Sequence, residues 1–240
     1  FSLPVVFVGA QRSSDRPSSD AALNLTSAAF FAVNSRKPGV YLAMHQSEND
    51  DYVAIHSGVR VRKNHTSRRD AFESIDTELV ARVKGNEIIW SQDVGSSKEV
   101  DEEIKLRTSF ASSVALLKFH PAFDPELLKF LSEEKKIKGL IIEGTGLGHV
   151  SDTVVSKISD LVAQGIFVGI TSQCIWGHVD LNVYDTGRDL LSAGAVPLEN
   201  MISETALAKL SWAVANFKDP KSIMQRNLLG EFFPRLLLNK

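Results

Sequence analysis

Disulfide pairs, long hydrophobic runs and an excess of either charge are all missing from this 240-residue chain. It has a single cysteine, Cys174, which can form no disulfide within the chain, so we expect a reducing compartment. No apolar run approaches the ~18 residues that a membrane span needs, and no basic-then-apolar signal opens the chain. These absences predict a cytoplasmic protein with no membrane contact.

The charges nearly cancel. The chain has 27 Lys plus Arg against 29 Asp plus Glu, a net charge of -2. Such a chain has no global attraction to nucleic acid, so any RNA contact would come from a local patch or a partner. With 43% hydrophobic and 23% charged residues it is typical of soluble globular proteins, which excludes disordered, collagen-like and coiled-coil classes.

The common catalytic and metal-binding motifs are also absent. The sequence has no Gly-x-Ser-x-Gly, His-Glu-x-x-His, Walker or Cys-x-x-Cys pattern, and its six histidines show no metal-ligand spacing. Residues 144–148 (Gly-Thr-Gly-Leu-Gly) depart from the dinucleotide-binding spacing, which favours a tight turn between a strand and a helix. For Cys174 we favour a buried structural role over a nucleophilic one. We therefore predict no metal site.

The first residues are typical of a buried strand. Val5 to Val8 form a continuous apolar run that Gly9 closes, and the chain does not begin with Met. A free terminus seldom lies inside a core strand, so we expect further residues upstream. Downstream, Asp20 is predicted to cap a helix, and residues 39–45 form the next expected strand. Residues 53–56 and 59–63 are two more expected strands, which flank Ser57-Gly58 as in a hairpin. Residues 77–83 are a weaker candidate for a strand.

The second half of the chain alternates strands and helices. Residues 93–107 are polar and charged, and we place a linker there between a domain at 1–92 and one at 108–240. Alternation beyond the linker predicts parallel strands joined by right-handed crossovers, hence an α/β fold. The expected strands are 114–119, 139–143 and 166–171, and the expected helices begin at 124, 151 and 202, with a helical tail at 223–238.

Residues 60–70 are the most highly charged segment, with six basic residues within ten positions. Three interpretations remain open from the residues alone: a solvated hairpin face, a patch for phosphate or RNA, or an active-site lysine at a strand end. No aromatic residue interleaves there to stack on bases. A chemically active lysine needs a lowered pKa or a fixed carboxylate partner, which spacing does not reveal.

Several long stretches resemble the asparaginase/glutaminase family. They are residues 8–20, 61–72, 143–149 and 171–188, and the likeness continues through 201–216. Two strings, Asp-Arg-Pro-Ser-Ser-Asp and His-Thr-Ser-Arg-Arg-Asp-Ala-Phe, are similar to the tRNA-dependent amidotransferase branch of that family. The resemblance implies a two-domain fold: a flavodoxin-like N-terminal domain, incomplete here, and a smaller parallel α/β C-terminal domain.

The resemblance also implies catalytic residues. The family attacks a side-chain amide with a threonine hydroxyl, which a second Thr, an Asp and a Lys activate. The Lys-Asn-x-Thr context identifies the lysine as Lys63, and Gly-Ala-Gln-Arg identifies Ala10 as the residue whose backbone carbonyl faces the substrate. The family's Thr-Gly-Gly-Thr-Ile-like and His-Gly-Thr-Asp-Thr-like motifs do not occur in this sequence. We therefore expect these 240 residues alone to be inactive.

By the same resemblance, the parent protein is a glutaminase subunit that takes L-glutamine and needs no cofactor or metal of its own. Its ammonia would pass to a partner E subunit that binds Glu-tRNA(Gln) and uses ATP and Mg²⁺ to form Gln-tRNA(Gln). The implied assembly is a homodimer within a heterotetramer, with tRNA held mainly by the partner. Two alternatives are a free cytoplasmic type I L-asparaginase and a non-catalytic subunit-docking fragment.

Overall fold

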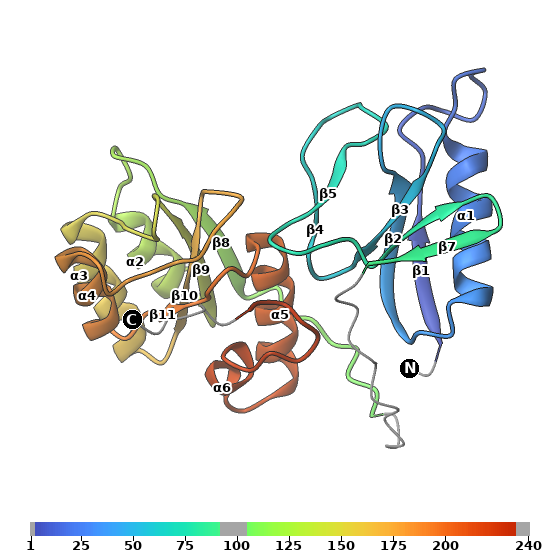
Figure 1. Cartoon of the computed structure of the whole chain (residues 1–240). Helices are drawn as coiled ribbons and strands as arrows, with labels where there is room; N and C mark the ends of the chain where they lie inside the picture. The colour runs from blue at the N-terminus through green and yellow to red at the C-terminus, as the bar shows by residue number, and fades with distance from the viewer. Residues whose placement is uncertain (1–2, 92–104, 234–240) are drawn as a thin grey trace, which may run out of the picture. The chain divides into compact units, whose positions relative to one another are not determined.

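A computed structural model describes residues 3–91 and 105–233 (Figure 1). The chain divides into two compact units, Phe1–Lys105 and Leu106–Lys240, hereafter unit 1 and unit 2. The linker predicted at 93–107 falls mostly outside the described residues. No helix of the described ranges has the length and apolar character that a membrane crossing requires.

Unit 1 is built on a five-stranded mixed sheet in the order β1-β2-β3-β6-β7 (Figure 1). Strands β1 and β2 are parallel, and every other neighbouring pair is antiparallel. The strands are β1 (Pro4–Val8), β2 (Gly39–His45), β3 (Val53–Ser57), β6 (Ala81–Lys84) and β7 (Glu87–Trp90), with helix α1 (Ala21–Asn34) between β1 and β2.

The two faces of this sheet are covered differently. Phe31 of α1 packs with Val53 and Ile55 of β3 in one apolar core. Because side chains alternate along a strand, Ala54 and His56 face the opposite side. There a separate hairpin lies against β3, formed by β4 (Val61–Lys63) and β5 (Phe72–Ser74). Within the described residues, the second face therefore has a hairpin rather than a helix over it.

One prediction for unit 1 was wrong, and two were confirmed only in part. The runs on either side of Ser57-Gly58 form no hairpin, because β3 pairs with β2 and β6 whereas β4 pairs with β5. The strand expected at 77–83 begins only at Ala81. Asp20 is the N-cap residue of α1, as predicted, but its side chain makes no capping hydrogen bond to the helix, because backbone N–H groups of the preceding loop occupy it.

Unit 2 is a parallel four-stranded sheet in the order β11-β10-β9-β8, as the alternating pattern predicted. Its strands are β8 (Val114–Lys118), β9 (Gly139–Gly144), β10 (Phe167–Ser172) and β11 (Val196–Pro197). Its helices are α2 (Glu126–Glu133), α3 (Asp152–Ala163), α4 (Asp185–Ser192), α5 (Ser203–Asn216) and α6 (Pro220–Met224).

Apolar cores lie on both faces of the unit 2 sheet. Leu140 and Ile142 of β9 join one core with residues of α2, α3 and α4, whereas Ile141 joins a second core with α5 and α6. This coverage explains the continuous apolar runs of its strands. Helix α4 was not predicted, and the helical tail expected at 223–238 is wrong up to residue 233, since α6 ends at Met224. Residues 234–238 lie outside the described range.

Candidate active site

Ala10 lies directly after β1, in an exposed loop at the carboxyl end of the strand. The buried carboxylate of Asp20 holds this loop, because it accepts the backbone N–H groups of Gln11 at 3.1 Å and Arg12 at 2.9 Å. Burial by itself would raise the pKa of Asp20, but these backbone hydrogen bonds outweigh it and the pKa is lowered. The loop that carries Ala10 is thus fastened by an ionised side chain.

A buried asparagine extends this anchor to the next strand. Asn24 on α1 donates from its side-chain nitrogen to the carbonyl of Gly9 and to the Asp20 carboxylate, both at 2.9 Å. Its oxygen lies 2.5 Å from Nδ1 of His45 at the end of β2. Since the Asn24 nitrogen already donates, His45 must donate the hydrogen of this last bond.

The contacts continue from His45 to the loop after β4. Nε2 of His45 lies 3.2 Å from a carboxylate oxygen of Asp50, and Arg69 donates to the same oxygen at 2.5 Å. Arg69 also donates to the carbonyl of Glu48. We call the set Asp20, Asn24, His45, Asp50 and Arg69 the polar relay. It joins the loops that follow β1, β2 and β4, and sequence reasoning missed it because its members are scattered in the chain.

Lys63 is the last residue of β4 and is exposed. It stands opposite Phe72 in the β4–β5 pair, and its Nζ lies 5.8 Å from the centre of the Phe72 ring. Among the described residues it forms no ion pair. The relay ends at Arg69 in the loop that follows Lys63, so it connects that loop to the one that carries Ala10. The catalytic role of Lys63 and the substrate contact of Ala10 stay predictions.

The other basic residues of the 60–70 segment are engaged within unit 1. Arg60 is 1% exposed and donates from Nε and Nη2 to the carbonyl of Ile75. Arg68 pairs with Asp70 at 2.8 Å. The interpretation as a solvated face is therefore wrong for Arg60, and Arg60, Arg68 and Arg69 are used inside the fold, which weakens the interpretation as an RNA patch.

Two family models match the chain. The asparaginase N-terminal model covers residues 1–95, and the glutaminase/asparaginase C-terminal domain model covers residues 113–226. The chain belongs to the asparaginase/glutaminase family.

Solved and curated relatives agree with this family. The structure matches that of the thermostable L-asparaginase from Thermococcus kodakarensis with a TM-score of 0.86 and 30% identity, covering 98% of this chain and 69% of the other. The D subunit of glutamyl-tRNA(Gln) amidotransferase from Thermofilum pendens is 48% identical over 92% of this chain and 49% of its own length. Its counterpart from Saccharolobus solfataricus is 44% identical over 98% and 54%. The chain thus spans about half the length of these curated relatives.

The other residues singled out in the sequence, the glycines of 144–148 and Cys174, lie in unit 2 at the carboxyl ends of β9 and β10. The glycines of 144–148 form the tight turn that was predicted. The backbones of Gly144 and Gly148 come so close that a Cβ on Gly144 would lie 2.4 Å from the backbone of Gly148. Ser172 donates to the carbonyl of Gly146 at 2.6 Å and accepts the backbone N–H of Cys174 at 2.9 Å. Cys174 is exposed, so the prediction of a buried structural cysteine is wrong.

The described residues contain no group of three or more His, Cys, Asp or Glu side chains that could hold a metal ion. His149 lies near the same edge of unit 2, with Nδ1 3.2 Å from the hydroxyl of Thr186 and its ring against Tyr184. These contacts give His149 a structural use within its own unit.

Proposed function

We propose that this chain is the greater part of the asparaginase-like region of a glutaminase subunit that serves a tRNA-dependent amidotransferase. The supporting observation is the identity of 44–48% with amidotransferase D subunits over almost the whole chain, against 30% with a solved L-asparaginase. The parent protein would release ammonia from L-glutamine. A partner E subunit, using ATP and Mg²⁺, would then convert Glu-tRNA(Gln) to Gln-tRNA(Gln).

The chemistry assigned to the residues of this chain is limited. Lys63, exposed at the end of β4, would hold a positive charge beside the family's Thr-Asp pair and help move a proton to or from the second threonine hydroxyl. The carbonyl of Ala10 would accept a hydrogen bond from the substrate amide. Neither the nucleophilic threonine motif nor the Thr-Asp motif occurs in the sequence.

Transfer between subunits would protect the ammonia. Ammonia released into water is protonated and diluted, and the ammonium ion is no nucleophile. A subunit of this kind is therefore expected to work in a complex, where the partner also supplies most of the tRNA contact. The net charge of -2 is consistent with this division of labour.

A fusion protein tests the catalytic proposal. The part of the Thermofilum pendens relative that lies ahead of its matched region is joined to this chain, and ammonia release from L-glutamine is measured. We expect the fusion to be active, Lys63→Ala to lower kcat by about a hundredfold or more, and the matched control Lys84→Ala to change little. The 240-residue chain alone should release none. Full activity of the Lys63→Ala fusion would contradict the role of this lysine.

Substrate choice separates the proposal from its rival, a free L-asparaginase, which the likeness to the Thermococcus kodakarensis structure favours. The fusion is assayed with L-glutamine and L-asparagine, with and without an E subunit, ATP, Mg²⁺ and Glu-tRNA(Gln). The proposal expects glutamine to be preferred and Gln-tRNA(Gln) to form. Strong unaided hydrolysis of asparagine, with no effect of the E subunit, would favour the rival.

A further inference from the structure

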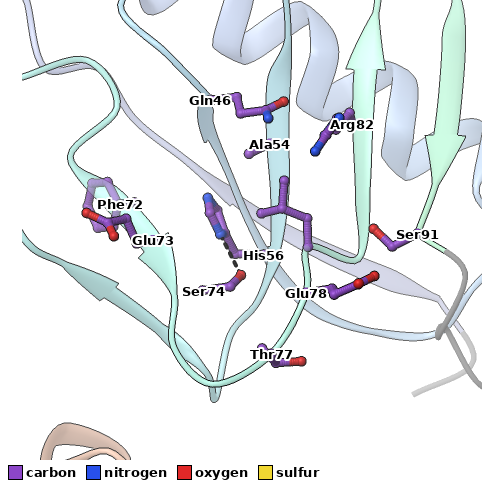
Figure 2. A pocket seen from close by; sticks show the side chains of 11 residues that line it. Gln46, Ala54, His56, Phe72, Glu73, Ser74, Thr77, Glu78, Arg82 and Ser91 are labelled. Atoms are coloured by element: carbon purple, nitrogen blue, oxygen red, sulfur yellow. Dashed lines mark hydrogen bonds between the residues drawn. The ribbon is translucent and has the colours of Figure 1, made fainter. Parts of the chain in front are cut away.

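The β4–β5 hairpin, which carries Lys63, is not packed closely against the sheet everywhere. A hollow of about 430 Å³ lies between them, lined by Phe72 on the hairpin and by Gln46 and His56 on the sheet side (Figure 2). The hydrogen bond between Nδ1 of His56 and the hydroxyl of Ser74, 2.9 Å long, joins the two sides. A hollow forfeits the contacts that packed side chains would make. Polar contacts therefore carry more of the support for the loop that follows Lys63.

The orientation of the Asn24 amide determines which hydrogen His45 carries. The Asn24 nitrogen faces two acceptors, the carbonyl of Gly9 and the carboxylate of Asp20, each at 2.9 Å. A flipped amide would turn its oxygen toward both acceptors, so this orientation is fixed by its partners. The Asn24 oxygen therefore faces His45, and Nδ1 of His45, 2.5 Å away, carries a hydrogen.

The second ring nitrogen of His45 faces a carboxylate. Nε2 lies 3.2 Å from Oδ1 of Asp50, whose pKa is lowered by the hydrogen bond with His45 and by that with Arg69. A neutral ring with its hydrogen on Nδ1 would turn a lone pair toward this oxygen, whereas a doubly protonated ring donates to it. His45 is fully buried, and a buried charge is costly unless it is paired. Asp50 and the ionised Asp20 supply the opposite charges.

We propose that His45 is a positioning residue of the proposed glutaminase reaction, and that only its doubly protonated ring joins the loop after Lys63 to the loop of Ala10. Nδ1–H holds the side of Ala10 through the polar relay, and Nε2–H holds Asp50, which Arg69 shares. When Nε2 loses its proton, a lone pair faces the carboxylate and the loop after Lys63 loosens. The catalytic consequence rests on the proposed function, whereas the proton and the link do not.

The charged groups around His45 give the pH dependence its sign. Asp20 and Asp50 have lowered pKa values and stay ionised above pH 5, and Arg69 stays charged. His65 in the loop after Lys63 accepts two backbone N–H groups of that loop through Nδ1, so its protonation would loosen the loop. Protonation of His45 would tighten the same loop. The two histidines therefore act in opposite directions as the pH falls.

The first measurement locates the proton in the 240-residue chain. Long-range ¹H–¹⁵N spectra between pH 5 and 8.5 report which ring nitrogens carry hydrogen. We expect both nitrogens of His45 to be protonated at the acid end, and Nε2 alone to lose its hydrogen as the pH rises. A neutral ring with its hydrogen on Nε2 would overturn the proposal.

A surface variant tests the partner of this proton without changing the buried ring. The Asp50 side chain is 71% exposed. In Asp50→Asn, Nε2 of His45 should lose its hydrogen about half a pH unit lower, a threefold change, because the carboxylate charge is gone. The matched control is Asp51→Asn, an exposed neighbour, which should change nothing. An equal shift in both variants would mean that Asp50 is not the specific partner.

Hydrogen exchange measures the link itself. The backbone N–H groups of Asn64 and Ala71 close the loop after Lys63 by hydrogen bonds of 2.7 and 3.2 Å. Relative to Asp50→Asn, their protection in the parent chain should fall about threefold between pH 6 and 8.5, since an asparagine can bond to either form of the ring. Comparing the two proteins removes the contribution of His65, which both contain. The same pH dependence in both would refute the proposal.

Kinetics of the fusion protein test the positioning role. Asp50→Ala should lower kcat for L-glutamine about threefold to tenfold and leave KM within about twofold, because Lys63 is displaced while substrate binding is kept. Asp50→Asn should restore most of the loss, and Asp51→Ala should cause none, with the folded fraction checked by the same spectra. An unchanged kcat in Asp50→Ala would refute the positioning role. A fusion with no activity at all would instead refute the proposed function, and the spectra and exchange would still decide whether a proton controls the link.

Discussion

The two units of the chain differ in how the two faces of their sheets are covered. In unit 2 the sheet has apolar cores on both faces, and its candidate residues lie in loops at the carboxyl ends of β9 and β10. In unit 1 one face is apolar, but the other contains buried polar residues such as His56, and a polar relay runs through the loops. The sheet of unit 2 is thus stabilised by apolar burial on both faces, whereas one face of the unit 1 sheet carries buried polar residues. The buried ion pair of unit 2, Lys209–Glu231, lies outside its strands.

An edge strand and an inner strand differ as well. Among the strands that the structure describes, β1 lies at the edge of the unit 1 sheet, and Phe7 on it is 63% exposed. In unit 2, Leu140 on the inner strand β9 is fully buried. Similar apolar residues therefore contribute differently, because stabilisation depends on the area removed from water.

The largest expected effect comes from the core of unit 2. Leu140→Ala removes a fully buried side chain from a packed sheet and should lower the free energy of unfolding by about 2–5 kcal/mol. Urea unfolding followed by tryptophan fluorescence in a Trp90→Phe background reports on unit 2 alone, since Trp176 and Trp212 lie there. A loss below about 1 kcal/mol would mean that the core relaxes around the cavity.

The next effect is a pH dependence in unit 1. The unfolded chain binds a proton at His56 near its ordinary pKa of 6.5, whereas the folded chain resists protonation down to about pH 4. Between these values the unfolded state binds more protons, so lowering the pH destabilises unit 1, by up to about 3 kcal/mol at pH 4.

Two variants isolate this histidine. His56→Asn should flatten the dependence of unfolding free energy on pH between pH 4 and 6.5, and His120→Asn, which changes an exposed histidine of unit 2, should leave it unchanged. The fluorescence of Trp90, read in a chain with Trp176→Phe and Trp212→Phe, follows unit 1. An unaltered slope in the His56→Asn protein would show that other groups titrate.

Breaking the polar relay should have a smaller but measurable effect. Asp20→Ala removes the acceptor of the Gln11 and Arg12 N–H groups and should destabilise unit 1 by about 1–3 kcal/mol. It should also speed amide hydrogen exchange in residues 9–19, which Asp15→Ala, an exposed change in the same loop, should not do. Unchanged exchange at Gln11 and Arg12 would mean that the carboxylate does not hold the loop.

The smallest effect is expected at the edge of unit 1. Phe7→Ser changes a side chain that is already 63% exposed and should alter the unfolding free energy of unit 1 by no more than about 0.5 kcal/mol. The same unfolding measurement with Trp90 tests it. A loss comparable to that of Leu140→Ala would remove the contrast between the two sheets.

Prediction from the sequence succeeded where the signal is local. The alternation after residue 113 indicated the parallel strands, and the glycines of 144–148 indicated the tight turn. It failed where a residue's partner is distant in the chain. Asp20 was predicted to cap α1, but its carboxylate binds the loop before the helix. The 53–63 hairpin failed for the same reason, since β3 pairs with strands outside it.

For the candidate site, motifs identified Lys63 and Ala10 as residues of interest. No motif indicated the polar relay that connects the loops of these two residues. Asn24, His45 and Asp50 match no spacing rule, and only the packing of α1 against β1 and β2 brings them together. The environment of His56 was equally hidden, because a lone histidine in a strand can be either exposed or buried.

Motifs and periodicity were enough to establish the family, the α/β rhythm of the second unit and the choice of Lys63 as the candidate lysine, because they are properties of neighbouring residues. The folded chain was needed to show that Arg60 is buried, that Cys174 is exposed, and that His56 and Gln46 face a hollow. Burial and hydrogen bonding depend on contacts between residues far apart in the chain, and these contacts exist only once the sheets have formed.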